Sequence, residues 1–126
     1  MELNKRQDDT VADVTSTTID DNGITINAEA NMPNYGRVRF TINVESNGER
    51  LSGTSYGSGR GAMDDGTFFS GSFSGKWRRE GTKAIMHHVV EVSNGDMNLD
   101  ILEFDATADS ITCLLYTSDA ADDTLC

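Results

Sequence analysis

The sequence predicts an all-β protein, an antiparallel up-and-down meander that closes into a small barrel of about eight strands. Two observations carry this prediction. Glycines recur at every second residue through much of Arg50–Gly81, and strands have a side-chain period of two. Short signals rich in Asn, Asp and Gly separate segments in which apolar and polar residues alternate, and no helical period of useful length appears.

Two other architectures fit parts of this pattern. The Gly- and Ser-rich composition of Arg50–Gly81 is also typical of a flexible linker. A linker, however, has no reason to place Phe69, Phe73 and Trp77 at even spacing. A two-sheet sandwich is the alternative for the whole chain. We favour it less because the expected strands exceed the usual length of about five or six residues, and because no crossing connection is visible.

The first half of the chain supplies three expected strands. The first covers about residues 11–20, although its alternation is poor, and a turn at Asp21-Asn22-Gly23 follows it. Residues 24–32 and 36–45 alternate between apolar and polar positions. Between them, Pro33-Asn34-Tyr35 fits a short loop, because Pro favours a turn and cannot serve a central strand.

Four loop signals set the register of the remaining strands. Asn47-Gly48, Glu80-Gly81 and Asn94-Gly95 predict two-residue turns, and Asp64-Asp65-Gly66 predicts a three-residue loop with its glycine in the left-handed conformation. Together these loops keep one apolar face continuous across five strands, and a slip of one residue at any of them would break it. The expected inner-face pairs include Val44 with Leu51, Gly57 with Phe73, Trp77 with Ala84, and Val92 with Met97.

The predicted register also places large side chains opposite glycines. Aromatic residues cover exposed backbone at strand glycines, and glycines within long strands mark the bends that a closing barrel needs. The pairs that follow from the Asp64-Asp65-Gly66 loop are Gly61 with Phe69, Gly57 with Phe73, and Gly53 with Trp77.

A single domain fits the 126 residues, since a chain of this length buries about two-thirds of its unfolded surface. Residues 1–10 are polar and charged without periodicity, so we expect a disordered N-terminus. The barrel domain is expected to cover residues 11–112, with an eighth strand beginning near Ile111.

The last segment, residues 113–126, reads CLLYTSDAADDTLC. It resembles the translated read-through of a transposon-type sequencing-library adaptor, which implies that native sequence ends near Thr112. The alternative is a C-terminal strand, because CLLYTS is sufficiently apolar. Both cysteines lie in this segment, so we infer no disulfide, thiol nucleophile or metal thiolate from them.

The chain is acidic, with 10 Lys and Arg against 21 Asp and Glu and a net charge of −11. This balance argues against nucleic acid as a partner, because binding to phosphates needs the opposite sign. No apolar run is long enough to cross a bilayer, and the start, MELNKRQDD, lacks the apolar centre of a signal peptide. We therefore expect a soluble, cytoplasmic protein with no membrane contact and no cofactor.

The inner face of the predicted barrel is the candidate site. Its glycines leave gaps that are either a ligand cavity or space filled by bulky neighbours, and small barrels often fill such space. The expected lining residues are Phe40, Phe69, Phe73, Trp77, Met86, His88, Leu99 and Glu103.

His88 and Glu103 are the polar candidates within this lining. The register puts them about one diagonal step apart, where an imidazole and a carboxylate could exchange protons with shifted pKa values. The alternative is a hydrogen-bonded core histidine and a glutamate that reaches water at the barrel mouth. His87 faces the opposite side of its strand, so no metal site is expected.

The outer face of the sixth and seventh expected strands carries a separate candidate surface. Exposed apolar residues there would mark an interaction surface for homo-oligomers. The residues expected on it are Ile85, Val89, Leu102 and Phe104.

The segment G-x-F-x-G-x-W-R-R-E-G at Gly71–Gly81, together with the preceding G-x-G-R-G and D-D-G turn, resembles strands of the calycin-like and the allene oxide cyclase/dirigent-like barrels. The resemblance covers about a quarter of the chain and implies an eight-stranded barrel with an apolar interior. It leaves three functions open: binding of a small apolar molecule, isomerase or cyclase chemistry at His88 and Glu103, and oligomerisation without a ligand.

Overall fold

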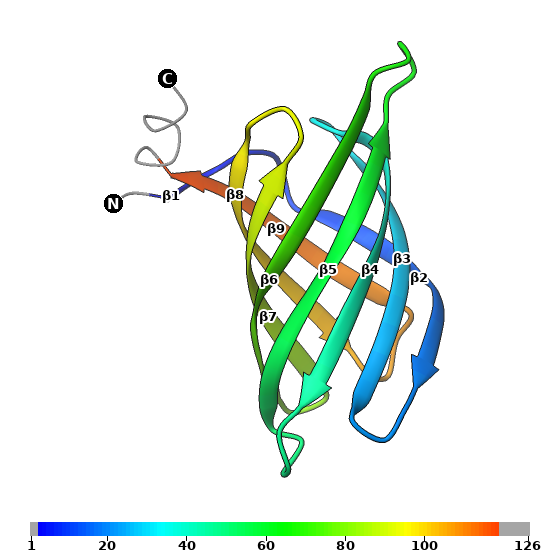
Figure 1. Cartoon of the computed structure of the whole chain (residues 1–126), viewed down its shortest axis with the longest axis vertical. Helices are drawn as coiled ribbons and strands as arrows, with labels where there is room; N and C mark the ends of the chain where they lie inside the picture. Colours follow the sequence, from blue (N-terminus) through cyan, green and yellow to red (C-terminus); the bar gives the residue numbers. More distant parts are fainter. Residues whose placement is uncertain (1–2, 119–126) are drawn as a thin grey trace.

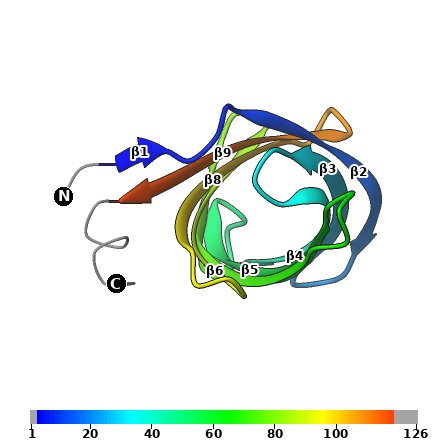
Figure 2. The ribbon, with the colours of Figure 1, turned by 90° about the horizontal axis from the view of Figure 1, so that it is seen from above.

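A computed structural model of the chain describes residues 3–118. Within this range the protein is all-β, and each strand pairs antiparallel with its neighbours (Figure 1). Eight strands, β2 to β9, form a closed barrel, which Figure 2 shows end-on. The strands are β1 (Leu3–Lys5), β2 (Thr10–Ile19), β3 (Gly23–Met32), β4 (Gly36–Ser46), β5 (Ser52–Ala62), β6 (Phe68–Glu80), β7 (Lys83–Val92), β8 (Met97–Asp105) and β9 (Ser110–Ser118). The predicted fold class is confirmed.

Strand β9 closes the barrel because it pairs with both β8 and β2. Its inward side chains include Cys113 and Leu115, which are buried. The predicted end of the barrel domain at Thr112 therefore falls inside a strand that runs to Ser118. This pairing does not bear on the coding origin of residues 113–118, because apolar residues beside open strand edges pair whatever their source. Residues 119–126 lie outside the described part of the chain.

Within the N-terminal segment that we expect to be disordered, the structure describes residues 3–10 and has a short strand there, β1. Strand β1 pairs with Tyr116–Ser118 of β9, and Figure 2 shows the two running outward from the ring. Arg6 donates its backbone N–H to the Leu115 carbonyl oxygen at 3.0 Å. The Gln7 side chain is buried. The residue composition of this segment does not predict that it hydrogen-bonds to the edge of β9.

The β5–β6 hairpin has the predicted register. Met63 N–H donates to the Thr67 carbonyl oxygen at 2.9 Å, and Gly66 adopts φ +93° in the three-residue loop. Aromatic rings cover the glycines as expected. A Cβ added at Gly57 would lie 2.7 Å from Cζ of Phe73, so the ring occupies the space that a side chain would need.

Two other loops differ from prediction by an even number of residues. Between β4 and β5 the loop has four residues with Arg50 at φ +59°, so Val44 pairs with Ser55 rather than Leu51. Between β6 and β7 the turn is Gly81-Thr82, with Gly81 at φ +61°, and Trp77 pairs with Met86 rather than Ala84. Even shifts leave every side chain on its expected face.

The loop between β7 and β8 differs by one residue, and this reverses the faces of β8. Met97 pairs with Glu91 rather than Val92. The loop is Ser93-Asn94-Gly95, with Gly95 at φ +96°, closed by a Val92 N–H bond to the Asp96 carbonyl oxygen at 3.0 Å. The predicted two-residue turn is therefore wrong.

After this reversal, the residues of β8 that point inward are Asn98, Asp100, Leu102 and Phe104 rather than Leu99 and Glu103. Leu102 is 2% exposed within the core cluster, and Phe104 packs against that cluster.

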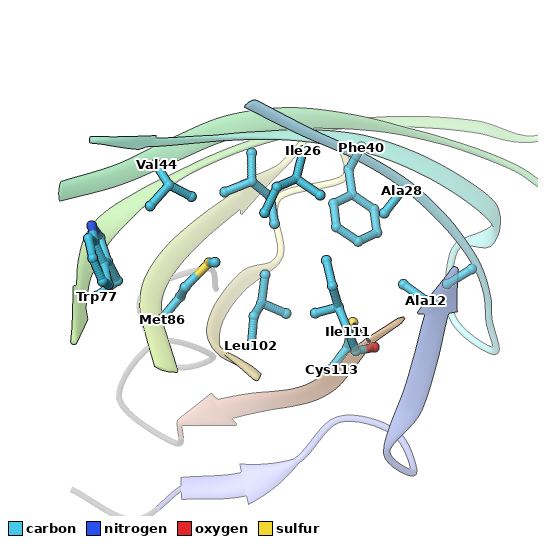
Figure 3. Packing of buried hydrophobic residues seen from close by; sticks show 12 residues of the cluster. Ala12, Ile26, Ala28, Phe40, Val44, Trp77, Met86, Leu102, Ile111 and Cys113 are labelled. Carbon is cyan, nitrogen blue, oxygen red and sulfur yellow. Dashed lines mark hydrogen bonds between the residues drawn. The ribbon is translucent and has the colours of Figure 1, made fainter. Parts of the chain in front are cut away.

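The core fills the middle of the barrel. Side chains from β2, β3, β4, β6, β7, β8 and β9 converge there, as Figure 3 shows. Of the two alternatives for the interior, space filled by bulky neighbours describes this region. The buried hydrophobic cluster comprises Ala12, Ile26, Ala28, Ala30, Phe40, Ile42, Val44, Trp77, Met86, Leu102, Ile111 and Cys113.

The reversed face of β8 predicts unequal effects of two leucine truncations. Leu102→Ala should lower the free energy of unfolding by about 2–5 kcal/mol, because it leaves a cavity in the core. Leu99→Ala on the outer face should lower it by about 1 kcal/mol or less. Urea denaturation of both variants measures the difference. A larger loss of stability for Leu99→Ala than for Leu102→Ala would instead favour the register that a two-residue turn gives, with Leu99 on the inner face.

Candidate functional site

A cavity of about 90 Å³ lies at the upper end of the barrel in Figure 1, near the β3–β4, β5–β6 and β7–β8 loops. We refer to it as the upper cavity. Its wall is largely apolar. Three inward glycines help to leave it open, since they contribute no side chain. The lining residues are Met32, Tyr35, Val38, Phe40, Gly59, Arg60, Gly61, Phe69, Ser70, Gly71, Phe73, Val90, Val92, Asn98, Asp100, Leu102 and Leu115.

Tyr35 anchors the loop end of the upper cavity. The residue belongs to the β3–β4 loop, yet it is buried and its ring meets Phe69 edge-on at a centroid distance of 5.4 Å. The Tyr35 hydroxyl donates to Asp96 Oδ2 at 2.8 Å and accepts a bond from Asn98 Nδ2 at 2.9 Å. Burial raises the pKa of Tyr35 to about 12, so its hydroxyl keeps its proton in ordinary buffers.

Arg6 completes this polar cluster from the segment between β1 and β2. Its Nε donates to Asn98 Oδ1, and its Nη1 lies 3.7 Å from Asp96 Oδ2. Asn98 is 2% exposed, and its amide bonds to both Tyr35 and Arg6. These bonds fix the orientation of Tyr35 over the cavity.

His88 lies below the upper cavity, within packed protein. It is 2% exposed, and its Nε2 lies 2.6 Å from Ser55 Oγ, a residue that is also buried. The Phe73 ring covers the imidazole at a centroid distance of 4.8 Å. Burial, and then the neighbouring His87, lower the pKa of His88 to about 4, so the imidazole is neutral at pH 7. Its Nδ1 is buried without a hydrogen-bond partner among residues 3–118.

Asp100 is the carboxyl group that borders the upper cavity. It pairs directly with His88 across β7 and β8. The residue is half-buried and borders the cavity. Desolvation raises the pKa of Asp100 to about 7. Its charge also helps burial to raise the pKa of the Cys113 thiol to about 12. Asp100 makes no hydrogen bond or ion pair with the described residues.

The structure brings together three of the eight predicted lining residues at the upper cavity, namely Phe40, Phe69 and Phe73. Met86 and His88 are inside the barrel but away from the cavity wall. The two that the reversal of β8 moves to the outer face are Leu99 and Glu103.

Trp77 lies near the opposite end of the barrel. Its Nε1 donates to the Glu45 carbonyl oxygen at 2.9 Å, and it lines openings there. Figure 3 shows it beside Val44 and Met86. Trp77 therefore does not report on the upper cavity.

Sequence reasoning missed Tyr35, Asn98 and Asp100. One signal for the last two was present. Asp65-Gly66 and Asn94-Gly95 occupy the same positions in their loops, and in each the Asp or Asn side chain accepts the N–H two residues further on, at 2.9 Å. A three-residue loop ending at Gly95, like the one that ends at Gly66, would have placed Asn98 and Asp100 on the inner face. Tyr35 carried no such signal, because a loop residue that folds over the barrel follows no period.

The proposed oligomer surface changes with the same correction. Leu102 and Phe104 point inward, so they are not available on the outer face. Ile85 is 5% exposed, and Val89 remains 47% exposed. Oligomerisation through this face stays a prediction.

No match to the chain was found among protein families, curated proteins or solved structures. Across residues 3–118, no group of three or more His, Cys, Asp and Glu side chains is arranged to hold a metal ion. The same residues contain no helix with the length and apolar character needed to cross a membrane.

His88 and Asp100 affect stability with opposite dependence on pH. Below its ordinary pKa of 6.5, an unfolded His88 binds a proton that the folded protein excludes down to about pH 4, so stability rises with pH through this window. Folded Asp100 keeps its proton up to a pKa of about 7, whereas the unfolded chain releases it above 3.8, so stability falls with pH through that window. Each slope is about 1.4 kcal/mol per pH unit, and the two nearly cancel between about pH 4 and 6.5.

Single substitutions should therefore expose one slope at a time. Relative to the unsubstituted protein, His88→Gln should lose stability as pH rises between about 4 and 6.5. Asp100→Asn should gain stability over the same range. Urea denaturation at intervals across it measures both slopes. Parallel profiles for the two variants and the unsubstituted chain would show that neither group is perturbed by burial.

Proposed function

We propose that the protein binds a small, mostly apolar molecule in the upper cavity, oriented by a hydrogen bond to the Asp100 carboxyl group. The observation that carries this proposal is Asp100 itself, which borders an apolar cavity without a hydrogen-bond partner among the described residues. A recess with apolar walls and a few polar groups is the usual form of a small-molecule site.

The size of the cavity limits the ligand. Its volume of about 90 Å³ is below the range of about 300–1,000 Å³ that is common for drug-sized ligands. An engineered cavity of about 150 Å³ holds benzene. The occupant is therefore a molecule of a few carbon atoms, or a single ring when Phe69 or Phe73, both half-buried, moves aside.

The protonation of Asp100 defines the polar group of the ligand. With a pKa raised to about 7, the Asp100 carboxyl is largely protonated below neutral pH and donates a hydrogen bond. A ketone, ether or ester oxygen accepts such a bond, whereas an anionic ligand would face the carboxylate that forms above pH 7. The ligand class that fits is a small neutral molecule with one acceptor oxygen.

The alternative of acid–base catalysis has less support. Glu103, its expected carboxylate, lies on the outer face. Asp100 is beside His88, but the imidazole does not border the upper cavity and Phe73 covers it. A ligand in the cavity has no path to the imidazole while Phe73 keeps this position. The resemblance to calycin-like and allene oxide cyclase/dirigent-like barrels stays a proposal, supported by the closed eight-stranded barrel alone.

Gly71→Val should abolish binding of a small probe by filling the upper cavity. A Cβ at Gly71 meets the Glu91 carbonyl oxygen at 3.3 Å and Val90 Cγ1 at 4.0 Å, so a side chain fits with a small adjustment. The probe is cyclopentanone, followed by the chemical shifts of Val90 and Leu115 methyl groups. Ser72→Val, on the exposed face of the same strand, is the matched control and should bind normally.

Cyclopentane provides the comparison for the hydrogen bond. It has the same ring without an acceptor, and it should bind several-fold more weakly below pH 7, since a hydrogen bond contributes about 1 kcal/mol. Asp100→Leu should remove this preference. Equal binding of cyclopentanone to Gly71→Val and to the unsubstituted protein would refute the proposal.

A further inference from the structure

The opposite end of the barrel has its own opening, of about 240 Å³, which we call the lower mouth. It is separated from the upper cavity by the packed core. Its floor is apolar and includes the rings of Trp77 from β6 and Phe104 from β8. The lining residues are Ile19, Asp20, Asp21, Asn22, Gly23, Ile24, Val44, Ser46, Arg50, Trp77, Arg79, Thr82, Lys83, Ala84, Phe104 and Ala106.

Cations gather at this opening although the protein as a whole carries a net charge of −11. Arg50, Arg79 and Lys83 all line it, and all three are exposed. Arg50 and Arg79 form no ion pair with any residue between 3 and 118. Elsewhere on the barrel, Arg37 is paired with Glu29 at 2.7 Å.

Backbone structure brings the two unpaired arginines together. Arg50 lies in the β4–β5 loop, where its N–H donates to the Asn47 carbonyl oxygen at 3.0 Å. The Arg79 N–H donates to the Leu51 carbonyl oxygen at 2.8 Å and so ties this loop to the end of β6. Arg79 also shares the inward face of β6 with Trp77, two residues closer to the strand end. Its side chain therefore projects over the lower mouth.

The rim of the lower mouth also carries acidic residues, so its charges are mixed. The Asp20 carboxylate accepts hydrogen bonds from the N–H groups of Asn22 and Gly23 at 2.8 and 2.9 Å, so it is committed to its own turn. Asp105 similarly accepts from Thr107 and also interacts with Lys83. Asp21 adds one further negative charge to the rim.

We infer that the lower mouth binds an amphipathic anion, with an aliphatic tail on Trp77 and Phe104 and a carboxylate or sulfate head group at Arg50 and Arg79. Arg50 and Arg79, which have no ion-pair partner among the described residues, suit such a head group, and the apolar floor suits the tail. This site is distinct from the upper cavity, where the ligand class is neutral. Its occupancy does not depend on whether the proposed function holds.

Trp77 is the single tryptophan of the chain, so its fluorescence reports on this opening. Sodium decanoate below its micelle concentration is the probe, and 1-decanol and decyltrimethylammonium are its neutral and cationic counterparts. Decanoate should shift Trp77 emission at lower concentration than either counterpart. Added salt should weaken decanoate binding and leave decanol binding unchanged, since salt screens exposed charges.

Two substitutions test the head-group contacts. Arg79→Gln should weaken decanoate binding by about two- to fivefold, as expected for one exposed ion pair. Arg50→Gly should weaken it similarly, yet leave the protein as stable or more so, because Arg50 has φ +59° and glycine adopts this conformation without strain. Loss of affinity without loss of stability separates a binding role from a structural one. Arg39→Gln is the control, because Arg39 is exposed, lines neither the lower mouth nor the upper cavity, and its substitution removes the same charge.

Several results would overturn the inference. They are an unchanged Trp77 emission, equal affinity for decanoate and decanol, or an equal loss with Arg39→Gln and Arg79→Gln. Gly71→Val distinguishes the two sites, because filling the upper cavity should leave decanoate binding intact. If Gly71→Val abolished it, decanoate would occupy the upper cavity and the assignment to the lower mouth would be wrong.

Discussion

Side chains alternate between the two faces of every strand, and this barrel depends on each loop keeping that alternation in phase. Because the period is two, a loop that changes the register by an even number of residues leaves the inner face intact. The β4–β5 loop is an example. Val44 pairs with Ser55, four positions beyond the residue that a two-residue turn would select, and the same side chains still point inward. A change of one residue in the length of the β7–β8 loop instead decides which alternate residues of β8 point into the interior.

This parity explains how far the sequence could be interpreted. The fold class followed from two features. One is the alternation of apolar and polar residues, which is unaffected by a register error of an even number of residues, and the other is the set of glycines opposite Phe69, Phe73 and Trp77. The Asp64-Asp65-Gly66 loop was predicted correctly because its glycine must adopt a positive φ. Asn94-Gly95 fits two loop lengths equally well by local preference, and its neighbours on β8 did not decide between them. Leu99, Ile101 and Glu103 alternate with Asn98, Asp100 and Leu102, so both faces of that strand contain apolar and acidic residues.

The site therefore differs from prediction more than the fold does. The predicted pair of His88 and Glu103 becomes His88 and Asp100, a carboxyl group on the neighbouring inward position. The sequence also could not show which of the two polar side chains is packed within the protein and which borders a cavity. His88 is enclosed by Ser55 and Phe73, whereas Asp100 borders the upper cavity, and this separates a packed polar group from one available to a ligand. Tyr35 enters the interior from a loop, where alternation makes no prediction.

The pairing of β9 with β2 has a consequence for the order in which the protein folds. Each of the other barrel contacts joins strands that follow one another in the chain, so hairpins from β2 to β8 can form as soon as their residues are available. Thr10 pairs with Cys113, and this contact must wait for almost the whole chain. Contacts between residues so distant in sequence are slow to form, because loop-closure entropy opposes them. Until β9 is in place, β2 and β8 are open sheet edges, and two such chains can pair with each other as readily as one chain closes on itself.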